Sequence, residues 1–330
     1  MSSFVVSNDH PSFTTIDGIV FDKSLKTLVA FPPGKNLTSF AVPESVRTLN
    51  SYAFYSNGAL KTISLPEKLN TVGRSAFHSC SQLTAMTIPN AVTELGDALF
   101  VACRSLSSVT LPSTITTIPI DAFHGCSSLM SIDIPRSVTA IGYAAFGECS
   151  SLKFIDLPDS VASIGDQAFF KCSGLRAISI PPTLSVVGEE AFDFCSSLQT
   201  VVIPASVKLI GLWAFRSCTS LESVTYLGVN PPTFVSDEKG YGPFCDCDKL
   251  KNVTVPECFK SALFDKFTVT KSLPCNLCGA DVVYSLSTSS GLLSISGEND
   301  MYDFKSSNQV PWFKSRSLVK SVAVGELEKG

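Results

Sequence analysis

Residues 135–149, PRSVTAIGYAAFGEC, together with the SSLKFIDLP that follows them, recur along this chain with a period of 23 residues. Proline, phenylalanine and cysteine each return at this step without slipping by one residue. The three series are Pro43, Pro66, Pro89, Pro112, Pro135, Pro158, Pro181 and Pro204; Phe54, Phe77, Phe100, Phe123, Phe146, Phe169, Phe192 and Phe215; and Cys80, Cys103, Cys126, Cys149, Cys172, Cys195 and Cys218. A fixed period of about 20 to 50 residues is the signature of a solenoid, whose coils stack only on their neighbours.

The composition agrees with one long packed array. Of 330 residues, 45% are hydrophobic and 16% are charged, which favours an ordered core over disorder. The net charge of -4 comes without a basic cluster, so neither nucleic acid nor an anionic membrane is an expected partner. The first residues lack the pattern of a secretory signal, and no run of about 18 apolar residues occurs. We therefore expect no direct membrane insertion, and either a cytosolic protein or a fragment of a longer one.

Each unit from Leu37 onward reads L-x-x-I-x-I-P-x-x-V-x-x-I-G-x-x-A-F-x-x-C-x-x. The alternating I-x-I step predicts a strand, and stacked copies predict a parallel sheet along one flank. Proline should end the strand because it lacks a ladder donor, and glycine should supply a φ that other residues avoid. The A-F-x-x-C step predicts a single helical turn. The expected fold class is an α/β solenoid, a curved, right-handed array of 23-residue coils.

Ten strand steps follow from this pattern. They are centred on Phe40, Ile63, Met86, Val109, Ile132, Ile155, Ile178, Val201, Val224 and Val253. The last step is displaced by an insertion of six residues, because Pro256 lies 52 residues, or two periods plus six, after Pro204. Since an end coil has one repeat neighbour, replacing Phe54 by alanine should cost less stability than replacing Phe146.

The regions outside the array have patterns of their own, which divide the chain into five segments. Residues 1–13 should be a tail, and 14–36 a hairpin cap with apolar runs at 16–21 and 25–31. Residues 37–256 form the solenoid, and 257–274 a helical cap and linker in which Phe259, Leu263 and Phe267 share one helix face. Residues 275–330 should be a second hairpin cap, pairing 283–286 with 292–295, that begins a further array.

Seven of the twelve cysteines occupy one repeat position, so stacking places them in a column about 4.8 Å apart. This spacing exceeds the Cβ separation of a disulfide and favours a ladder of buried thiols, with disulfides or a metal as alternatives. Outside the ladder, Cys275 and Cys278 form a C-x-x-C, with Cys245, Cys247 and Cys258 the nearest other cysteines. A lone C-x-x-C can be a metal ligand pair, a local disulfide or two linker thiols.

The repeat units resemble the BspA-like leucine-rich repeats over residues 37–256, and DGIVF...LVAFPPG is similar to the N-terminal cap of that family. The segment SLSTSSGLLSISGENDMYDF...PWF is similar to the cap that opens further arrays in its large surface proteins. The resemblance implies a surface or secreted protein of bacteria or parasitic protists that adheres to host proteins or other cells. It implies neither catalytic residues nor a cofactor.

The residues themselves give little support to catalysis. His78 and His124 stand two coils apart, roughly 10 Å, too far for a catalytic triad. The middle residue of each I-x-I step should point outward, giving a polar face with Asp133 and Asp156 at its centre and Arg136, Lys153 and Arg176 beside them. These five residues are the candidate ligand-binding set. The expected function is non-enzymatic binding of proteins or glycans, by a cell-surface or secreted adhesin or surface antigen or, alternatively, by an intracellular scaffold in the cytoplasm.

Overall fold

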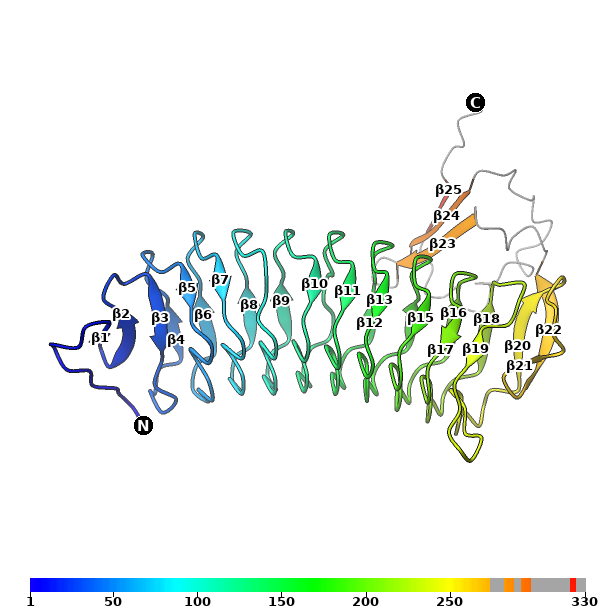
Figure 1. Cartoon of the computed structure of the whole chain (residues 1–330), viewed down its shortest axis with the longest axis horizontal. Coiled ribbons are helices and arrows are strands. Elements are labelled where there is room, and N and C mark those ends of the chain that lie inside the picture. The colour runs from blue at the N-terminus through cyan, green and yellow to red at the C-terminus, as the bar shows by residue number, and fades with distance from the viewer. Residues whose placement is uncertain (274–281, 288–291, 298–320, 325–330) are drawn as a thin grey trace, which may run out of the picture. The chain divides into compact units, whose positions relative to one another are not determined.

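A computed structural model describes residues 1–273, 282–287, 292–297 and 321–324. The chain divides into two compact units, one of residues 1–152 and 165–173, the other of residues 153–164 and 174–330. Figure 1 shows strands β1 to β11 of the first unit and β12 to β25 of the second. Pairing within each unit is parallel between successive coils, and the partners lie 23 residues apart, as in Ser39↔Thr62 and Val186↔Leu209. The predicted 23-residue coil with parallel sheets is confirmed.

The first unit contains two sheets and a separate strand pair. One sheet has the order β1-β2-β3-β5-β7, the other β4-β6-β8-β9, and β10 pairs with β11. The strands are β1 (Phe13–Ile16), β2 (Ile19–Asp22), β3 (Thr27–Ala30), β4 (Ser39–Ala41), β5 (Thr48–Leu49), β6 (Thr62–Ser64), β7 (Thr71–Val72), β8 (Ala85–Thr87), β9 (Ser108–Thr110), β10 (Thr117–Ile118) and β11 (Ala140–Ile141).

The second unit repeats this arrangement. One sheet has the order β12-β14-β16-β18-β20-β22-β21, a second ladder runs β13-β15-β17-β19, and β23-β24-β25 form a third sheet. The strands are β12 (Phe154–Ile155), β13 (Ser163–Ile164), β14 (Ala177–Ser179), β15 (Val186–Val187), β16 (Thr200–Ile203), β17 (Leu209–Ile210), β18 (Ser223–Tyr226), β19 (Thr233–Phe234), β20 (Asn252–Pro256), β21 (Leu263–Phe264), β22 (Phe267–Leu273), β23 (Val282–Ser287), β24 (Leu292–Gly297) and β25 (Ser321–Val324).

Two features of the strands differ from the prediction. Of the ten predicted strand steps, the one centred on Ile132 lies outside the named strands. The V-x-x-I-G step, expected only to turn the chain, carries a second parallel ladder through two-residue strands such as β15 and β17. A turn precedes this ladder, because the proline carbonyl accepts a hydrogen bond from the third residue on, as in Val138 N to Pro135 O at 3.0 Å.

The predicted helical turn in A-F-x-x-C is wrong, and the described residues contain no helix, so the α/β class becomes a β-solenoid. The residue before the alanine and the residue before the cysteine both have left-handed backbones, with φ of 53° at Ser75 and 59° at Ser79. A right-handed helix cannot pass through such residues. Successive turns replace it, in which Phe54 N donates to Ala76 O of the next coil and Tyr55 N donates to Tyr52 O within its own coil.

The glycine column is explained by close packing and not by an unusual φ. None of Gly73, Gly142 and Gly165 has a positive φ. A Cβ atom added to Gly142 would lie 2.8 Å from Ile120 N, and one added to Gly73 would lie 2.5 Å from Ser51 N. These neighbours are backbone atoms of the preceding coil, so glycine is required because two coils approach each other closely.

The core is a column of phenylalanine rings in each unit. The ladder residues from Phe54 to Phe215 are all 0% exposed. Ring centroids lie 5.3 Å apart between Phe123 and Phe146, and 5.1 Å apart between Phe192 and Phe215, with the rings nearly parallel. Stacking at one spacing explains why the aromatic position never slips along the sequence.

The N-terminal segment contains two antiparallel pairs, β1 with β2 and β2 with β3. The β3 strand pairs in parallel with β5, and Phe31 stacks on Phe54 with centroids 5.2 Å apart. The tail is bonded to this segment, since Phe4 N donates to Gly18 O at 2.9 Å. The role of residues 14–36 as a cap of the array stays a prediction.

The helix predicted in 257–269 is wrong. These residues contain β21 and the start of β22, which form an antiparallel pair around Asp265, a residue with φ of 55°. The β22 strand also pairs in parallel with β20, through Val253↔Val269 and its neighbours. Pairing with an available sheet edge outweighs the small helix propensity of so short a segment.

Two further predictions about the C-terminal half are confirmed. The register Val224↔Val253 spans 29 residues, which is one period plus the predicted six. The second hairpin also forms, because β23 and β24 pair antiparallel through Leu286↔Leu293 and its neighbours. Whether this hairpin begins a further array stays a prediction. Cys275 and Cys278 lie outside the described residues.

Candidate functional site

The outward side of the sheet β4-β6-β8-β9 is an exposed surface of the first unit. In β6, β8 and β9 the central residue is buried while the residues on both sides of it are exposed. The exposed residues of the four strands are Ser39, Ala41, Thr62, Ser64, Ala85, Thr87, Ser108 and Thr110. We call these eight residues the polar face. In the second unit the corresponding column is more covered, since Ser179 is half-buried and Thr225 is buried.

The predicted ligand-binding residues are divided between the two units. Asp133 and Arg136 lie in the first unit, and both are exposed. Asp133 stands between the buried Ile132 and Ile134, so its carboxylate points outward as predicted. Neither residue takes part in an ion pair within the part of the chain that the structure describes. The site therefore has an acid and a base available for a ligand in this unit.

The remaining three predicted residues lie in the second unit. Asp156 is half-buried, while Lys153 and Arg176 are exposed. The structure brings the two bases onto neighbouring coils, where Arg176 N donates to Lys153 O at 3.1 Å. Two cations side by side on an exposed column can attract an anionic group of a ligand.

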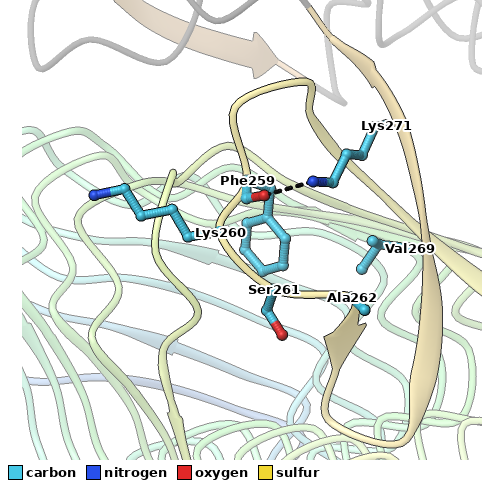
Figure 2. Close-up of a pocket in the computed structure, with 6 residues that line it drawn as sticks. All are labelled: Phe259, Lys260, Ser261, Ala262, Val269 and Lys271. Carbon is cyan, nitrogen blue, oxygen red and sulfur yellow. Dashed lines mark hydrogen bonds between the residues drawn. The ribbon is translucent and has the colours of Figure 1, made fainter.

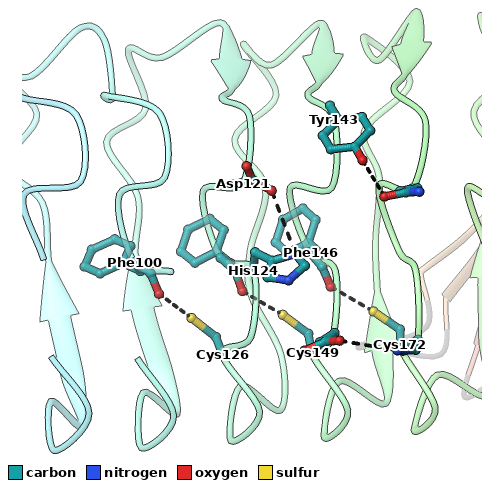
Figure 3. A network of polar contacts seen from close by, with 12 residues as sticks. Phe100, Asp121, His124, Cys126, Tyr143, Phe146, Cys149 and Cys172 are labelled. Carbon is teal, nitrogen blue, oxygen red and sulfur yellow. Dashed lines mark hydrogen bonds and ion pairs between the residues drawn. The ribbon is translucent and has the colours of Figure 1, made fainter. Parts of the chain in front are cut away.

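Figure 3 shows the thiol ladder of the first unit, in which each S–H donates to the phenylalanine carbonyl of the preceding coil. The sulfur to oxygen distance is 3.1 Å for Cys126 to Phe100, and 3.0 Å for Cys172 to Phe146. Burial raises the pKa of the Cys80 and Cys172 thiols to about 12. The prediction of buried thiols is confirmed for these residues, which are protonated at neutral pH and poor nucleophiles.

The two histidines of the array lie at separate loops. His78 contacts Ser79 Oγ at 2.9 Å, and burial lowers its pKa. His124 lies 3.8 Å from the Asp121 carboxylate, whose pKa is raised chiefly by burial (Figure 3). Among the described residues, His78 with Ser79 and His124 with Asp121 are two pairs on different coils, and they do not come together as the nucleophile, base and orienting acid of one triad.

A charged and aromatic cluster in the second unit was missed by the sequence analysis. Asp193 is 0% exposed, and its two carboxylate oxygens accept hydrogen bonds from Arg216 Nε, at 3.0 Å, and from Nη2. The guanidinium lies over the Trp213 ring, 4.3 Å from its centroid. Burial raises the pKa of Asp193, and the hydrogen bonds that Arg216 donates to Asp193 raise the pKa of Arg216. The available signal was an acid and an arginine 23 residues apart at one repeat position.

A pocket of about 680 Å³ lies in the last part of the second unit, and Figure 2 shows the side chains that line it. Its lining consists of Phe259, Lys260, Ser261, Ala262, Val269 and Lys271. Lys271 Nζ donates to Phe259 O at 2.7 Å, so this lysine holds the loop against β22. The mixture of two lysines and apolar walls fits binding of an anionic group better than it fits acid–base chemistry.

Two searches of the described residues gave no site. No three His, Cys, Asp or Glu side chains there come together in a way that could hold a metal ion. Nor do these residues contain a helix of the length and hydrophobicity needed to cross a bilayer.

The architecture defines a leucine-rich repeat β-solenoid, and comparison with known proteins agrees. The BspA type leucine-rich repeat region, six copies long, matches residues 29–153 and 139–273. The chain therefore belongs to the BspA type leucine-rich repeat family. No curated protein matches it.

Several solved structures are similar to this chain. A leucine-rich repeat protein from Eubacterium ventriosum has a TM-score of 0.54 and 24% identity, and the match covers 66% of this chain and 52% of that one. The chain thus spans about half the length of that relative. The T. pallidum leucine-rich repeat protein has a TM-score of 0.47 and 25% identity over 63% and 86% of the two chains. The pneumococcal vaccine antigen PcpA has a TM-score of 0.43 and 20% identity over 79% and 81%.

Proposed function

We propose that this protein is a non-enzymatic binding protein of the cell surface or extracellular space, an adhesin or surface antigen that recognises proteins or glycans. The observation that carries the proposal is the polar face of the first unit. Most of its side chains are small and carry a hydroxyl group, and they stand on strands that pair in parallel, so a partner can contact these side chains without breaking the pairing. The surface location rests on the family resemblance.

Direct binding tests the face. The whole chain is screened against immobilised extracellular matrix proteins and a glycan array, and the wild type is compared with Thr87→Lys/Thr110→Lys. Two lysines would place bulk and charge on the face, and we expect binding to fall about tenfold or more. Thr117→Lys, an exposed threonine of β10 outside the polar face, is the matched control and should bind normally. Equal binding by all three proteins would refute a role for the face.

The predicted acidic and basic residues are proposed as a second part of the recognition surface. Asp133 and Asp156 would contact donors of the partner, with Arg136, Lys153 and Arg176 contacting its acidic groups. The Asp133→Asn/Asp156→Asn protein keeps the size of both side chains while removing their charge. We expect weaker binding of the partner found in the screen and a changed salt dependence. An unchanged affinity would remove these two residues from the surface.

The second candidate function is an intracellular protein-interaction scaffold. The observation that favours it is the set of ladder thiols such as Cys103 and Cys126, which donate S–H bonds and form no disulfides. Labelling of intact cells with a membrane-impermeant reagent separates the candidates. Labelled protein supports the surface assignment, whereas protein labelled only after lysis supports the scaffold.

A further inference from the structure

The two sheets of the first unit end differently at their N-terminal edges. The sheet through β5 continues into β3, β2 and β1, so the first strand of its array is covered by a neighbour. The sheet through β4 has the order β4-β6-β8-β9, and β4 pairs only with β6. Within the described residues, β4 is therefore an open edge strand, a feature that proteins commonly block because it invites pairing.

The hydrogen bonds to β6 identify the backbone groups that remain open. Val42 N donates to Ser64 O at 2.9 Å, and Thr38 O accepts from Thr62 N at 3.2 Å. Because backbone groups alternate in direction along a strand, Ser39 and Ala41 direct their N–H and C=O groups away from β6. No partner for these groups occurs in the part of the chain that the structure describes. They form two donors and two acceptors on one line.

The side chains show the same opening. Leu37 is 37% exposed, whereas the equivalent Leu60, Leu83 and Leu106 of the next coils are 0% exposed. Phe31 covers part of the neighbouring Phe40, with ring centroids 4.9 Å apart, whereas Leu37 keeps more than a third of its surface exposed. Residues 37–42 contain neither proline nor charge, the usual means of blocking an edge strand. An apolar side chain could therefore be buried beside Leu37.

We propose that the β4 edge is a docking site for an extended polypeptide strand of a partner protein, which adds in parallel to β4. Its backbone would bond to Ser39 and Ala41, and an apolar side chain would cover Leu37. Parallel addition would place a side chain of the partner on Leu37 in the same way that the leucines of all later coils stack on one another. Two β4 strands related by a two-fold axis would be antiparallel, which would place Leu37 opposite Pro43 and lose that stacking. Ser39 and Ala41 also belong to the polar face, but this site uses their backbone groups at the edge of the sheet, whereas Thr87 and Thr110, which test the face, lie on β8 and β9.

The test uses a fluorescein-labelled peptide with the sequence LKTISLP of residues 60–66, the strand that pairs with β4 on its other side. Anisotropy should rise with the concentration of the whole chain, and a scrambled peptide should give no rise. Ala41→Pro removes an N–H that points away from β6, a position at which edge strands tolerate proline. The loss of one backbone hydrogen bond and the bulk of the ring should weaken peptide binding about tenfold.

Ala41→Ser is the matched control, because it changes the side chain but keeps the N–H, and it should bind the peptide normally. Thermal unfolding of both variants confirms that they fold. Equal peptide binding by Ala41→Pro and the wild type would overturn the proposal. So would a concentration-dependent dimer in sedimentation that Ala41→Pro abolishes while the peptide fails to bind, since the occupant would then be a second copy. Neither outcome depends on Thr87 or Thr110, so it is distinct from failure of the polar face.

Discussion

The first coil and the central coils of the first unit place different residues at the same repeat position. Cys126 sits in a central coil and donates its S–H to Phe100 O of the coil before it, at 3.1 Å. Asn57 sits in the first coil, where the neighbouring segment offers several carbonyls, and its Nδ2 lies 3.1 Å from Pro32 O. Asn57 Oδ1 also accepts from Leu60 N at 2.9 Å. The position thus requires a buried hydrogen-bond donor directed at the preceding backbone. Cysteine suffices where one carbonyl accepts, whereas asparagine occurs where several backbone groups need a partner.

The largest expected difference between the two positions is their response to alkaline pH. The thiol pKa is about 9.0 in the unfolded chain and is raised by burial to about 12 in folded Cys80 and Cys172. The contribution of each buried thiol to the free energy of unfolding is therefore fully present below pH 9. It falls by about 1.4 kcal/mol per pH unit for each buried thiol as the pH rises toward 12. Urea unfolding at several pH values measures this loss. Cys126→Ala should reduce the slope, whereas stability that stays level to pH 11 would contradict the ladder.

The next largest effect concerns the phenylalanine column. Phe146→Ala should cost about 3 to 5 kcal/mol, because it removes a buried ring from a stack. The repeat period alone suggests a smaller loss for Phe54→Ala, yet Phe54 is 0% exposed and stacks on both Phe31 and Phe77. We now expect the two losses to agree within about 1 kcal/mol. Chemical unfolding decides, and a Phe54 variant much more stable than the Phe146 variant would show that Phe31 does not replace a coil.

Alanine substitution at the ladder position compares Asn57 of the first coil directly with Cys126 of a central coil. Asn57→Ala removes the acceptor of two backbone N–H groups, those of Ala59 and Leu60, and should cost about 2 to 4 kcal/mol. Cys126→Ala removes one weak hydrogen bond and a small volume, and should cost about 1 to 2 kcal/mol. The difference in unfolding free energy between the variants is the measured quantity. Equal losses would mean that the extra hydrogen bonds of Asn57 contribute little.

The smallest expected effect concerns the glycine position, where the first coil has Asn50 and most later coils have glycine. A Cβ on Gly142 would meet the backbone of the preceding coil at 2.8 Å, so Gly142→Ala should cost about 1 to 3 kcal/mol. Asn50→Ala should change stability by less than about 0.5 kcal/mol, because its side chain is exposed. Thermal melts compare the two, and an unaffected Gly142→Ala protein would show that neighbouring coils can separate.

The period predicted the coil, the column of rings and the buried thiols because each follows from stacking identical units. It could not predict the backbone of A-F-x-x-C, since apolar spacing at i, i+1 and i+4 fits both a helical turn and the observed turns around Tyr52 and Ser56. The helix expected near Phe259 and Phe267 failed for a related reason. A short sequence does not record that an open edge of β20 lies beside it.

The candidate site was predictable only in part. Exposure of Thr87 and Thr110 follows from strand alternation, so the sequence sufficed for the polar face. The Asp193 and Arg216 pair could be predicted only with knowledge of burial. The residue after the ladder phenylalanine is buried in the coil of Asp193 and half-buried in the coil of Arg216. The β4 edge needed sheet order, because no residue type marks a strand that lacks a neighbour.

The alternating turns of the A-F-x-x-C step have a consequence for hydrogen exchange. Amides of Tyr52, Phe54 and Ser56 donate to the next coil, whereas those of Ala53, Tyr55 and Asn57 donate within their own. Separation of two coils would release every second amide to solvent while the amides between them stay protected. Fast-exchanging and slow-exchanging amides would then alternate along this loop. The exchange rates of the fast amides would report how often neighbouring coils separate without either one unfolding.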